Sequence, residues 1–232
     1  MKELLNIIST IDCKGKESIN PTEIYNEGWM TRLLMYYSIK KKKTFAGIDF
    51  KHLKRWTSEG LISSPFVHAQ QNREGYTHAD MVLGDFSIDY EKRGEIIADN
   101  MAEIFGIIEA KMGSPLSSGT KNAPNYNQAS RNVACIAFNT DKNCKTFFYV
   151  VAPECKKSEI IIKLNTNIIE TQIKDRYVLS NMPVDQDLVS KASSCEKDII
   201  TYEEWISIFN GRDRRKLQDF YNKCLKWNNI KK

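Results

Sequence analysis

The chain has 232 residues, with 34 Lys or Arg against 29 Asp or Glu, which gives a formal net charge of +5. Hydrophobic residues make up 41% and charged residues 27%, ordinary values that exclude a disordered or fibrous chain. The length favours one domain with a substantial core. The longest apolar runs, such as 147–152, are far shorter than the roughly 18 residues that a membrane-spanning helix needs, so we expect no membrane partner.

Six cysteines are scattered along the chain, and no two of them form a CxxC pair. This spacing argues against a zinc ribbon and, in a chain of this length, against a disulfide scaffold. The first residues lack the apolar segment of a secretory signal. We therefore expect reduced thiols and a cytoplasmic location.

Positive charge is concentrated in two stretches. Residues 40–55 hold seven Lys or Arg and one Asp, and residues 212–232 hold eight Lys or Arg and two Asp, so the rest of the chain is net acidic. Two basic surfaces on an acidic body suit a polyanion such as nucleic acid, and they equally suit two solvated surfaces. Charge alone leaves that choice open.

The predicted elements begin with a helix. Asn20 suits an N-cap position and Pro21 the first turn, and apolar residues then recur at helical spacing as far as the lysine run at 40–43. A second helix is predicted at 50–59, with Gly60 as its stop.

The centre of the chain changes from helical to strand periodicity. Short apolar runs at 79–86 and 104–111 predict strands that are joined by a polar connection. Residues 112–127 are rich in Gly, Ser, Pro and Asn, and predict a long loop of a kind that is often functional. A helix at 126–137 and a buried strand at 146–152 are predicted next.

The last part of the chain is mainly helical. Apolar residues three or four apart predict a helix at 158–176, and a short strand is predicted to end at 199–200. A capping box at Thr201 opens a helix that we expect to end at Gly211. A basic amphipathic helix at 212–232 completes the chain, and we expect its aromatic residues to pack on the core.

The order of these elements predicts an α/β fold in which helices cover a sheet. No internal repeat and no strong break in composition marks a second domain. We therefore expect a single domain over residues 1–232, with its core at about 20–210 and the basic helix at 212–232.

The most informative segment is the apolar run 104–108 with Glu109, Ala110 and Lys111 directly after it. Residues two apart on a strand share a face, so Glu109 and Lys111 should project together from a buried strand. Asp80 starts another apolar run, and adjacent strands would bring it close to Glu109. Two carboxylates suit Mg²⁺, which prefers oxygen ligands and takes only one or two carboxylates from a protein. Lys111 would then act on the attacking water or on a phosphate.

Asp80 followed by Glu109-Ala110-Lys111 after an apolar strand resembles the PD-(D/E)xK nuclease superfamily. The resemblance covers roughly residues 20–152. It implies the restriction-endonuclease-like core, which is a central mixed β-sheet flanked by helices.

Two further residues fit the superfamily. Glu27 lies on the first predicted helix, where many members carry a glutamate that helps to bind metal. Gln128 lies on the helix after the proposed active-site strand, where many members carry a glutamine.

Three positions leave alternatives or depart from the pattern. Ala79 stands where the motif's name has proline, a change that many members share. Asp85, 24 residues before Glu109, is a rival to Asp80 as the metal ligand, and the 29-residue separation of Asp80 from Glu109 implies an inserted turn or short helix. Glu23 shares a helix face with Glu27, although it suits helix capping better.

The resemblance implies a nuclease that uses Mg²⁺ or Mn²⁺ to hydrolyse phosphodiester bonds, with DNA as the expected substrate and a role in restriction, defence or repair. Asp80, Glu109 and Glu27 would bind the metal. Lys111 would act on the nucleophilic water, and Gln128 would orient water or a phosphate. The candidate contacts to nucleic acid are Lys41, Lys42, Lys54, Arg55, Lys121 and Arg131.

Two other functions remain open. A protein of the same fold that had lost cleavage would only bind nucleic acid, although the intact Asp, Glu, Lys and Gln set argues against that loss. A subunit of a larger complex would instead use its final helix to dock onto a partner protein. Many members of the superfamily pair to cut both strands, so a homodimer is compatible with the resemblance.

Overall fold

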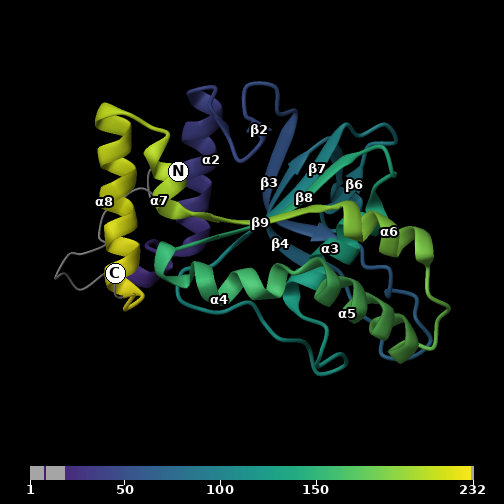
Figure 1. The fold of residues 1–232 in the computed structure, drawn as a ribbon. Coiled ribbons are helices and arrows are strands. Elements are labelled where there is room, and N and C mark those ends of the chain that lie inside the picture. The colour runs from purple at the N-terminus through teal and green to yellow at the C-terminus, as the bar shows by residue number, and fades with distance from the viewer. Residues whose placement is uncertain (1–7, 9–18, 231–232) are drawn as a thin grey trace.

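The computed structural model describes Ile8 and residues 19–230 (Figure 1). Its centre is a seven-stranded sheet with the strand order β5-β6-β3-β4-β7-β8-β9, and a separate two-stranded sheet is formed by β1 and β2. Helices lie on both faces of the large sheet (Figure 1). The predicted α/β class, with a mixed central sheet flanked by helices, is therefore confirmed.

The strands have the bounds β1 (Thr44–Phe45), β2 (Ile48–Asp49), β3 (Arg55–Ile62), β4 (Thr77–Gly84), β5 (Phe86–Asp89), β6 (Glu95–Ala98), β7 (Ile104–Ala110), β8 (Lys145–Ala152) and β9 (Glu196–Thr201). The α-helices have the bounds α2 (Glu27–Lys40), α3 (Gln128–Asn139), α4 (Lys157–Ile161), α5 (Thr166–Leu179), α6 (Gln186–Ser194), α7 (Tyr202–Ser207) and α8 (Gly211–Trp227). Short 3₁₀ turns occur at η1 (Pro21–Glu23), η2 (Tyr90–Lys92), η3 (Glu154–Lys156) and η4 (Ile162–Leu164).

The sheet combines antiparallel and parallel pairing. β4 runs antiparallel to both β3 and β7, whereas β7, β8 and β9 run parallel to one another. Buried parallel strands need apolar side chains on both faces, which explains the nearly continuous apolar runs of β7 and β8. The helix α3 forms the crossover between β7 and β8, and its first residue is therefore placed close to the end of β7.

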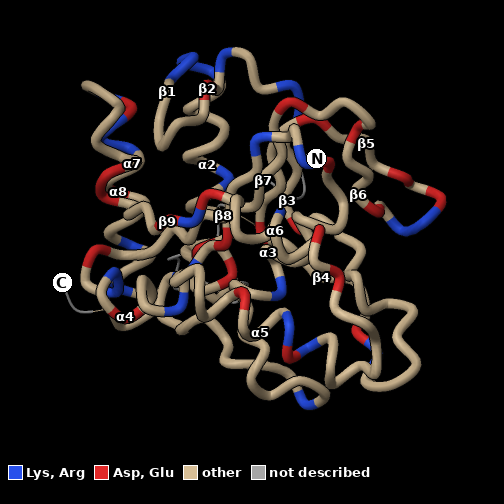
Figure 2. Tube along the Cα trace, turned by 45° about the vertical axis from the view of Figure 1, so that its right-hand side comes forward, with Lys and Arg blue, Asp and Glu red and all other residues tan. Residues whose placement is uncertain are grey.

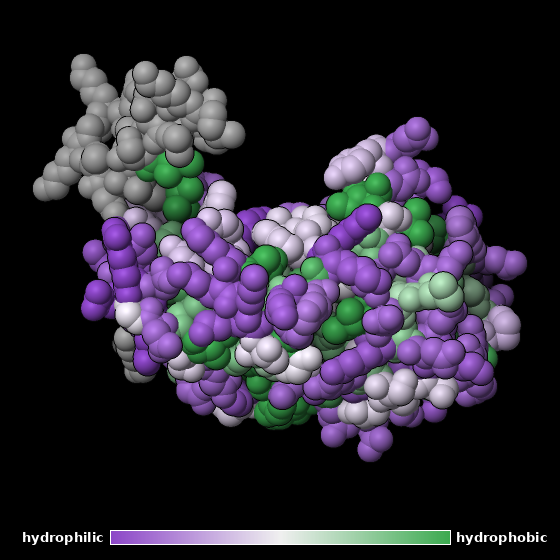
Figure 3. Space-filling model, turned by 90° about the horizontal axis from the view of Figure 1, so that it is seen from above, coloured by the Kyte–Doolittle hydropathy of each residue, from purple (hydrophilic) through white to green (hydrophobic). Residues whose placement is uncertain are grey.

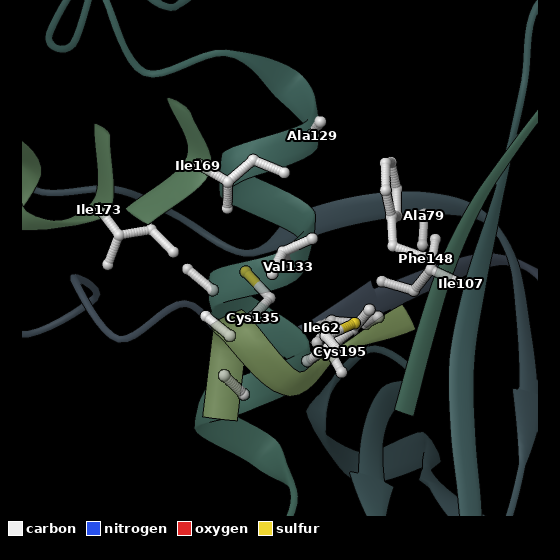
Figure 4. Packing of buried hydrophobic residues seen from close by; sticks show 14 of the residues in the cluster. Ile62, Ala79, Ile107, Ala129, Val133, Cys135, Phe148, Ile169, Ile173 and Cys195 are labelled. Atoms are coloured by element: carbon white, nitrogen blue, oxygen red, sulfur yellow. The ribbon is translucent and has the colours of Figure 1, made fainter. Parts of the chain in front are cut away.

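Each face of the sheet has its own hydrophobic core. On one face, Val133 of α3 and Ile173 of α5 pack towards Ile107 and Phe148 of the sheet (Figure 4). The other face is covered by α2, α7 and α8, and Trp205 is fully buried there.

The basic helix α8 belongs to the core and is not an appendage to it. Leu217 and Tyr221 are each at most 1% exposed, and Phe220 and Trp227 are partly buried in the same cluster. The prediction that the aromatic residues of this helix pack on the core is confirmed, whereas the predicted core boundary at residue 210 was too early. Lys231 and Lys232 of the basic stretch lie outside the described residues.

The first predicted helix begins later than expected. Asn20 does act as a cap, but only for the 3₁₀ turn η1. The helix α2 starts at Glu27, because the side chain of Asn26 accepts a hydrogen bond from the backbone N–H of Trp29 and so provides the N-cap.

The second predicted helix, at 50–59, was wrong, because β3 occupies the second half of this range. Pairing with β4 on one side and β6 on the other outweighs the weak helical spacing. Gly60 is therefore not a helix stop. It lies inside β3, where a Cβ atom would come within 2.5 Å of the Val82 side chain.

Three smaller differences follow from capping residues. The predicted helix at 158–176 is divided, because Asn165 caps a new helix, α5. The helix α6, capped by Asp185, was not predicted. The capping box at Thr201 is confirmed, but α7 ends at Ser207, and Gly211 begins α8 instead of ending the helix before it.

Among the described residues, no helix is long and apolar enough to cross a membrane. Hydrophilic residues dominate the face seen from above in Figure 3, where hydrophobic residues form small separate areas. The described cysteines are free thiols, and Cys135 and Cys195 are buried among apolar residues. Cys13 lies outside the described residues.

Candidate active site

The candidate site lies where the pairing between β4 and β7 stops. The antiparallel ladder runs from Gly84 opposite Phe105 to Met81 opposite Ile108 and goes no further. At the next position, the backbone N–H of Ala110 donates to Oδ2 of Asp80 at 2.8 Å. The aspartate side chain therefore takes the place of a backbone acceptor and is held at the end of β7.

The neighbouring strand is also irregular at this point. Glu59 of β3 has a positive φ of 56°, and neither Glu59 nor Asp80 takes part in the register that pairs the residues on either side of them. Ala79 and Met81, two residues apart, pack in the cores on opposite faces of the sheet, although a regular strand would put them on one face. Asp80 therefore lies at the irregular position of β4 where the side chains switch from one face of the sheet to the other.

Glu109 is 1% exposed and faces the start of α3. Its Oε1 atom lies 2.8 Å from Nζ of Lys111 and 2.5 Å from Nε2 of Gln128. Nδ2 of Asn132 lies 3.5 Å from its Oε2 atom. The buried carboxylate is thus held by one ammonium group and by the first turns of α3, whose N-cap is Asn127.

Burial, together with the nearby negative charge of Asp80, raises the pKa of Glu109 to about 8 against the opposing effect of Lys111. At neutral pH the carboxyl therefore retains its proton unless a cation compensates its charge. Two carboxyl groups crowded in a buried space are costly without such compensation, and this arrangement is frequent at functional sites.

The donor set fits a small, oxygen-preferring divalent cation. Among residues 8 and 19–230, no group of three His, Cys, Asp or Glu is placed to share one metal ion. Zinc sites usually need three or four such ligands, whereas Mg²⁺ takes one or two carboxylates and fills its other positions with water or phosphate oxygens. The adjacent carboxyl groups of Asp80 and Glu109 are oxygen donors of the kind that Mg²⁺ takes from a protein.

Glu27 does not join these two carboxylates. It lies at the start of α2, and among the described residues no group of three His, Cys, Asp or Glu, with or without Glu27, is placed to hold one metal ion. Burial raises the pKa of Tyr202, and the carboxylates of Glu27 and Asp80 contribute to that rise. Both carboxylates therefore lie near the Tyr202 hydroxyl, but the three predicted metal ligands do not form one set.

Asp85 lies at the opposite end of the β4–β7 pairing. Its carboxylate accepts a hydrogen bond from the backbone N–H of Glu103 at 2.8 Å and lies 3.2 Å from Nζ of Lys54. It is 2% exposed. These contacts hold a turn in place, so of the two aspartates considered from the sequence, only Asp80 lies beside Glu109.

Four of the predicted nucleic-acid contacts lie away from the carboxylates, near the β1–β2 hairpin, where Figure 2 shows lysines and arginines gathered. Lys41 is paired with Asp213 at 2.8 Å, which joins the two basic stretches. Lys42 is exposed at the end of α2, and Arg55 is opposite Gly84, at the far end of β4 from Asp80. Lys54 is paired with Asp85. Lys41, Lys42, Lys54 and Arg55 therefore belong to a basic surface that lies apart from the Asp80 and Glu109 carboxylates.

The other two predicted contacts lie nearer to the carboxylates. Lys121 is exposed in the long loop, whose position at 112–127 was predicted correctly. Arg131 is on α3, one turn after Gln128, and with Gln128 it lines a cavity of about 390 Å³.

Sequence reasoning placed Asn132 beside Arg131 as a residue that could hold a phosphate or cap local structure, but missed its direct contact with Glu109. Its position four residues after Gln128 on one helix face was the signal that could have identified this contact. Arg73 and Glu74, which line the same cavity as Arg131, come from an irregular segment without periodicity, so no sequence pattern indicated them.

No protein-family model, curated protein or solved structure matches the chain. The function of the site therefore rests on its own chemistry: two adjacent carboxyl groups, one ammonium group and two amides at the end of a buried strand.

Proposed function

We propose that the chain is a Mg²⁺-dependent nuclease that hydrolyses phosphodiester bonds, with DNA as its expected substrate. The observation that carries the proposal is the set of contacts at Glu109, where Lys111 and Gln128 share one carboxylate oxygen and Asp80 is held one residue further on. These residues are separated by up to 48 positions in the sequence, yet they meet at one strand end.

The fold supports the same proposal. The order α2, β3, β4, β7, α3, β8 agrees with the core that the resemblance to PD-(D/E)xK nucleases implies, including an active-site strand followed by a helix that carries the glutamine. We infer a restriction-endonuclease-like arrangement from this order and from the mixed sheet. The long separation of Asp80 from Glu109 is filled by β5, η2 and β6.

In the proposed reaction, Asp80 and Glu109 would hold a metal ion, which when bound would supply positive charge to the phosphate and lower the pKa of a bound water. Lys111 is 13% exposed on its side chain, so its ammonium group is largely desolvated but reachable. It donates to the phosphate oxygens, on which negative charge increases in the transition state. Gln128 and Asn132 keep the Glu109 carboxylate in one orientation.

A second candidate function is nucleic-acid binding without cleavage. The observation that favours it is the basic surface near the β1–β2 hairpin, where the Lys41–Asp213 pair joins both basic stretches at a distance from the carboxylates. A polyanion held only there would not need the Glu109 site. The two functions therefore make different predictions for substitutions at the Glu109 site. If the protein is a nuclease, such substitutions reduce cleavage, and if it only binds nucleic acid, they change no more than the stability of the fold.

The deciding experiment compares purified wild-type protein with Lys111→Ala and Lys142→Ala on circular and linear DNA, with Mg²⁺ and with a chelator. Lys142 is exposed in the turn after α3 and serves as the matched control. We expect cleavage that requires Mg²⁺, that is lost in Lys111→Ala and is unchanged in Lys142→Ala. Cleavage by Lys111→Ala at the wild-type rate would show that the site is wrongly assigned.

A further inference from the structure

A polar cavity of about 390 Å³ adjoins the candidate active site. Its wall is formed by residues 73–78, part of the long loop, α3 and α5. Gln128 contacts Glu109 and also lines the cavity, and His78 lines it two residues before Asp80. A chemical group in this cavity would therefore lie directly beside the carboxylates.

Two arginine side chains in the cavity have free guanidinium nitrogens. Arg131 makes no hydrogen bond or ion pair with any residue that the structure describes, and its buried Nε atom has no partner. Arg73 uses Nε to donate to the backbone oxygen of Ala69 at 3.0 Å, which leaves its two terminal nitrogens available. Both groups can donate paired hydrogen bonds to a planar or tetrahedral anion.

A third arginine supplies fixed positive charge. Arg176 of α5 is 2% exposed, donates to Ser180 and to the backbone oxygen of Asn72, and lies 4.5 Å from the centre of the Phe66 ring. No carboxylate of the described residues lies within ion-pair distance of it, although it is close enough to Glu74 for its charge to oppose the rise in the pKa of that carboxyl. The guanidinium charge of Arg176 adds to the positive potential of the cavity.

Glu74 is the acidic residue of the cavity wall. Burial raises its pKa, Ser64 donates to Oε2 at 2.7 Å, and Oε1 has no partner. Even with Glu74 ionised, three positive charges face one negative charge. The net positive charge and the two free guanidinium groups favour an anion over a neutral base as the ligand.

The size of the cavity also suits a phosphate. Its volume is roughly ten times the 30 Å³ that one water occupies in the liquid, so a phosphate group with part of its sugar can enter. Arg55 lies at the other end of β4, so these arginines add to Lys111 as cations placed to hold the substrate beside Glu109.

We propose that this cavity binds a phosphate group of the nucleic acid next to the phosphate that is cleaved, with Arg131 and Arg73 as its ligands. The proposal rests on the proposed nuclease function. The bound phosphate would fix the position of the strand relative to Asp80 and Glu109. The same chemistry suits an internal phosphate or the phosphate at a strand end, and the test separates these two sources.

The test uses Arg131→Gln, which removes the charge but keeps a polar side chain, with Lys142→Gln as a control of equal charge change. We expect Arg131→Gln to raise KM about tenfold, with a smaller change in kcat, and to reduce the slope of log affinity against log salt by about one. Lys142→Gln should leave both quantities unchanged. Arg131→Lys should recover part of the loss.

The substrates are closed circular DNA and linear DNA with or without a terminal phosphate. An effect of Arg131→Gln on circular DNA supports an internal phosphate, and an effect confined to phosphorylated ends supports a terminal one. If Arg131→Gln matches the wild type on every substrate, the proposal is wrong. Should that variant fail to fold, the exposed Arg73→Gln provides the same comparison.

Binding of a short oligonucleotide in the presence of a chelator separates this proposal from the nuclease function. If the wild-type protein cleaves nothing, but Arg131→Gln lowers its affinity for the oligonucleotide and the salt dependence of that affinity, the phosphate site is supported and the nuclease function is wrong. If the wild-type protein cleaves DNA and Arg131→Gln changes neither KM nor binding, the nuclease function is supported and the phosphate site is wrong.

Discussion

The strand pair β4–β7 has a buried carboxylate at each end, and the two ends are built in opposite ways. Asp85 at one end accepts a backbone N–H from Glu103 and lies beside Lys54, so its charge is compensated. Glu109 at the other end lies beside a second carboxylate, Asp80, and burial raises its pKa to about 8.

The comparison distinguishes Asp85, whose carboxylate stabilises the fold, from Glu109, whose ionised carboxylate destabilises it. Hydrogen bonds to a buried charged group stabilise a protein, whereas a buried acid next to another acid lowers the free energy of unfolding. The end with the lysine and the glutamine of the proposed site is the one where two carboxyl groups lie beside a single ammonium group. The following predictions test this difference.

The largest effect is expected on catalysis. Asp80→Asn should lower kcat about a thousandfold or more, because one of two metal-binding carboxylates is lost. The fold should persist, since the asparagine oxygen can still accept the N–H of Ala110. Cleavage kinetics with circular dichroism as the folding control test this, and wild-type activity in Asp80→Asn would contradict the site.

Asp85→Ala should have the converse effect. The backbone N–H of Glu103 would lose its charged acceptor, so we expect the free energy of unfolding to fall by about 1.5–3 kcal/mol. Activity per folded molecule should stay near the wild-type value. Denaturant titration measures the stability and cleavage assays on the same sample measure the activity. A loss of activity without a loss of stability would instead favour Asp85 as the metal ligand.

Glu109→Gln should change how the stability of the metal-free protein depends on pH. The pKa of Glu109 is raised from 4.5 to about 8 on folding, so between these values the folded state binds a proton that the unfolded state has lost. Stability from this group is therefore complete below pH 4.5, decreases with rising pH by about 1.4 kcal/mol per unit, and is lost above pH 8. Glutamine removes this dependence.

The free energy of unfolding of Glu109→Gln, relative to that of the wild type, should therefore increase as the pH rises from about 5 to 8. Asp85→Asn serves as the comparison, because it should lose stability without such a gain over the same range. Parallel pH profiles for Glu109→Gln and the wild type would mean that Glu109 is not buried beside Asp80 in this way.

A smaller effect is expected on metal binding. Mg²⁺ must displace the proton of Glu109, so its affinity should rise up to about tenfold per pH unit below pH 8 and become constant above it. Calorimetric titration in buffers of different ionisation enthalpy should record nearly one proton released per ion at pH 7. Affinity that does not change with pH would contradict a role for Glu109 as a ligand.

The parts of the fold that were predicted from the sequence depend on local signals. Helix α3, strand β7 and the capped start of α7 follow from apolar periodicity and capping residues, which act over a few positions. The second half of the predicted helix at 50–59 was wrong, because residues 55–59 belong to β3, whose conformation depends on partners in β4 that are distant in the sequence.

The sequence by itself determined which chemical groups stand at the end of β7, because Glu109 lies in this short strand and Lys111 directly follows it. Only the tertiary structure decided that Asp80 ends the pairing beside them, that Glu27 does not join them in one ligand group, and that Arg131 lines the adjoining cavity. The physical reason is that pairing register, burial and proton affinity depend on long-range packing, which brings together residues that have no local relation in the chain.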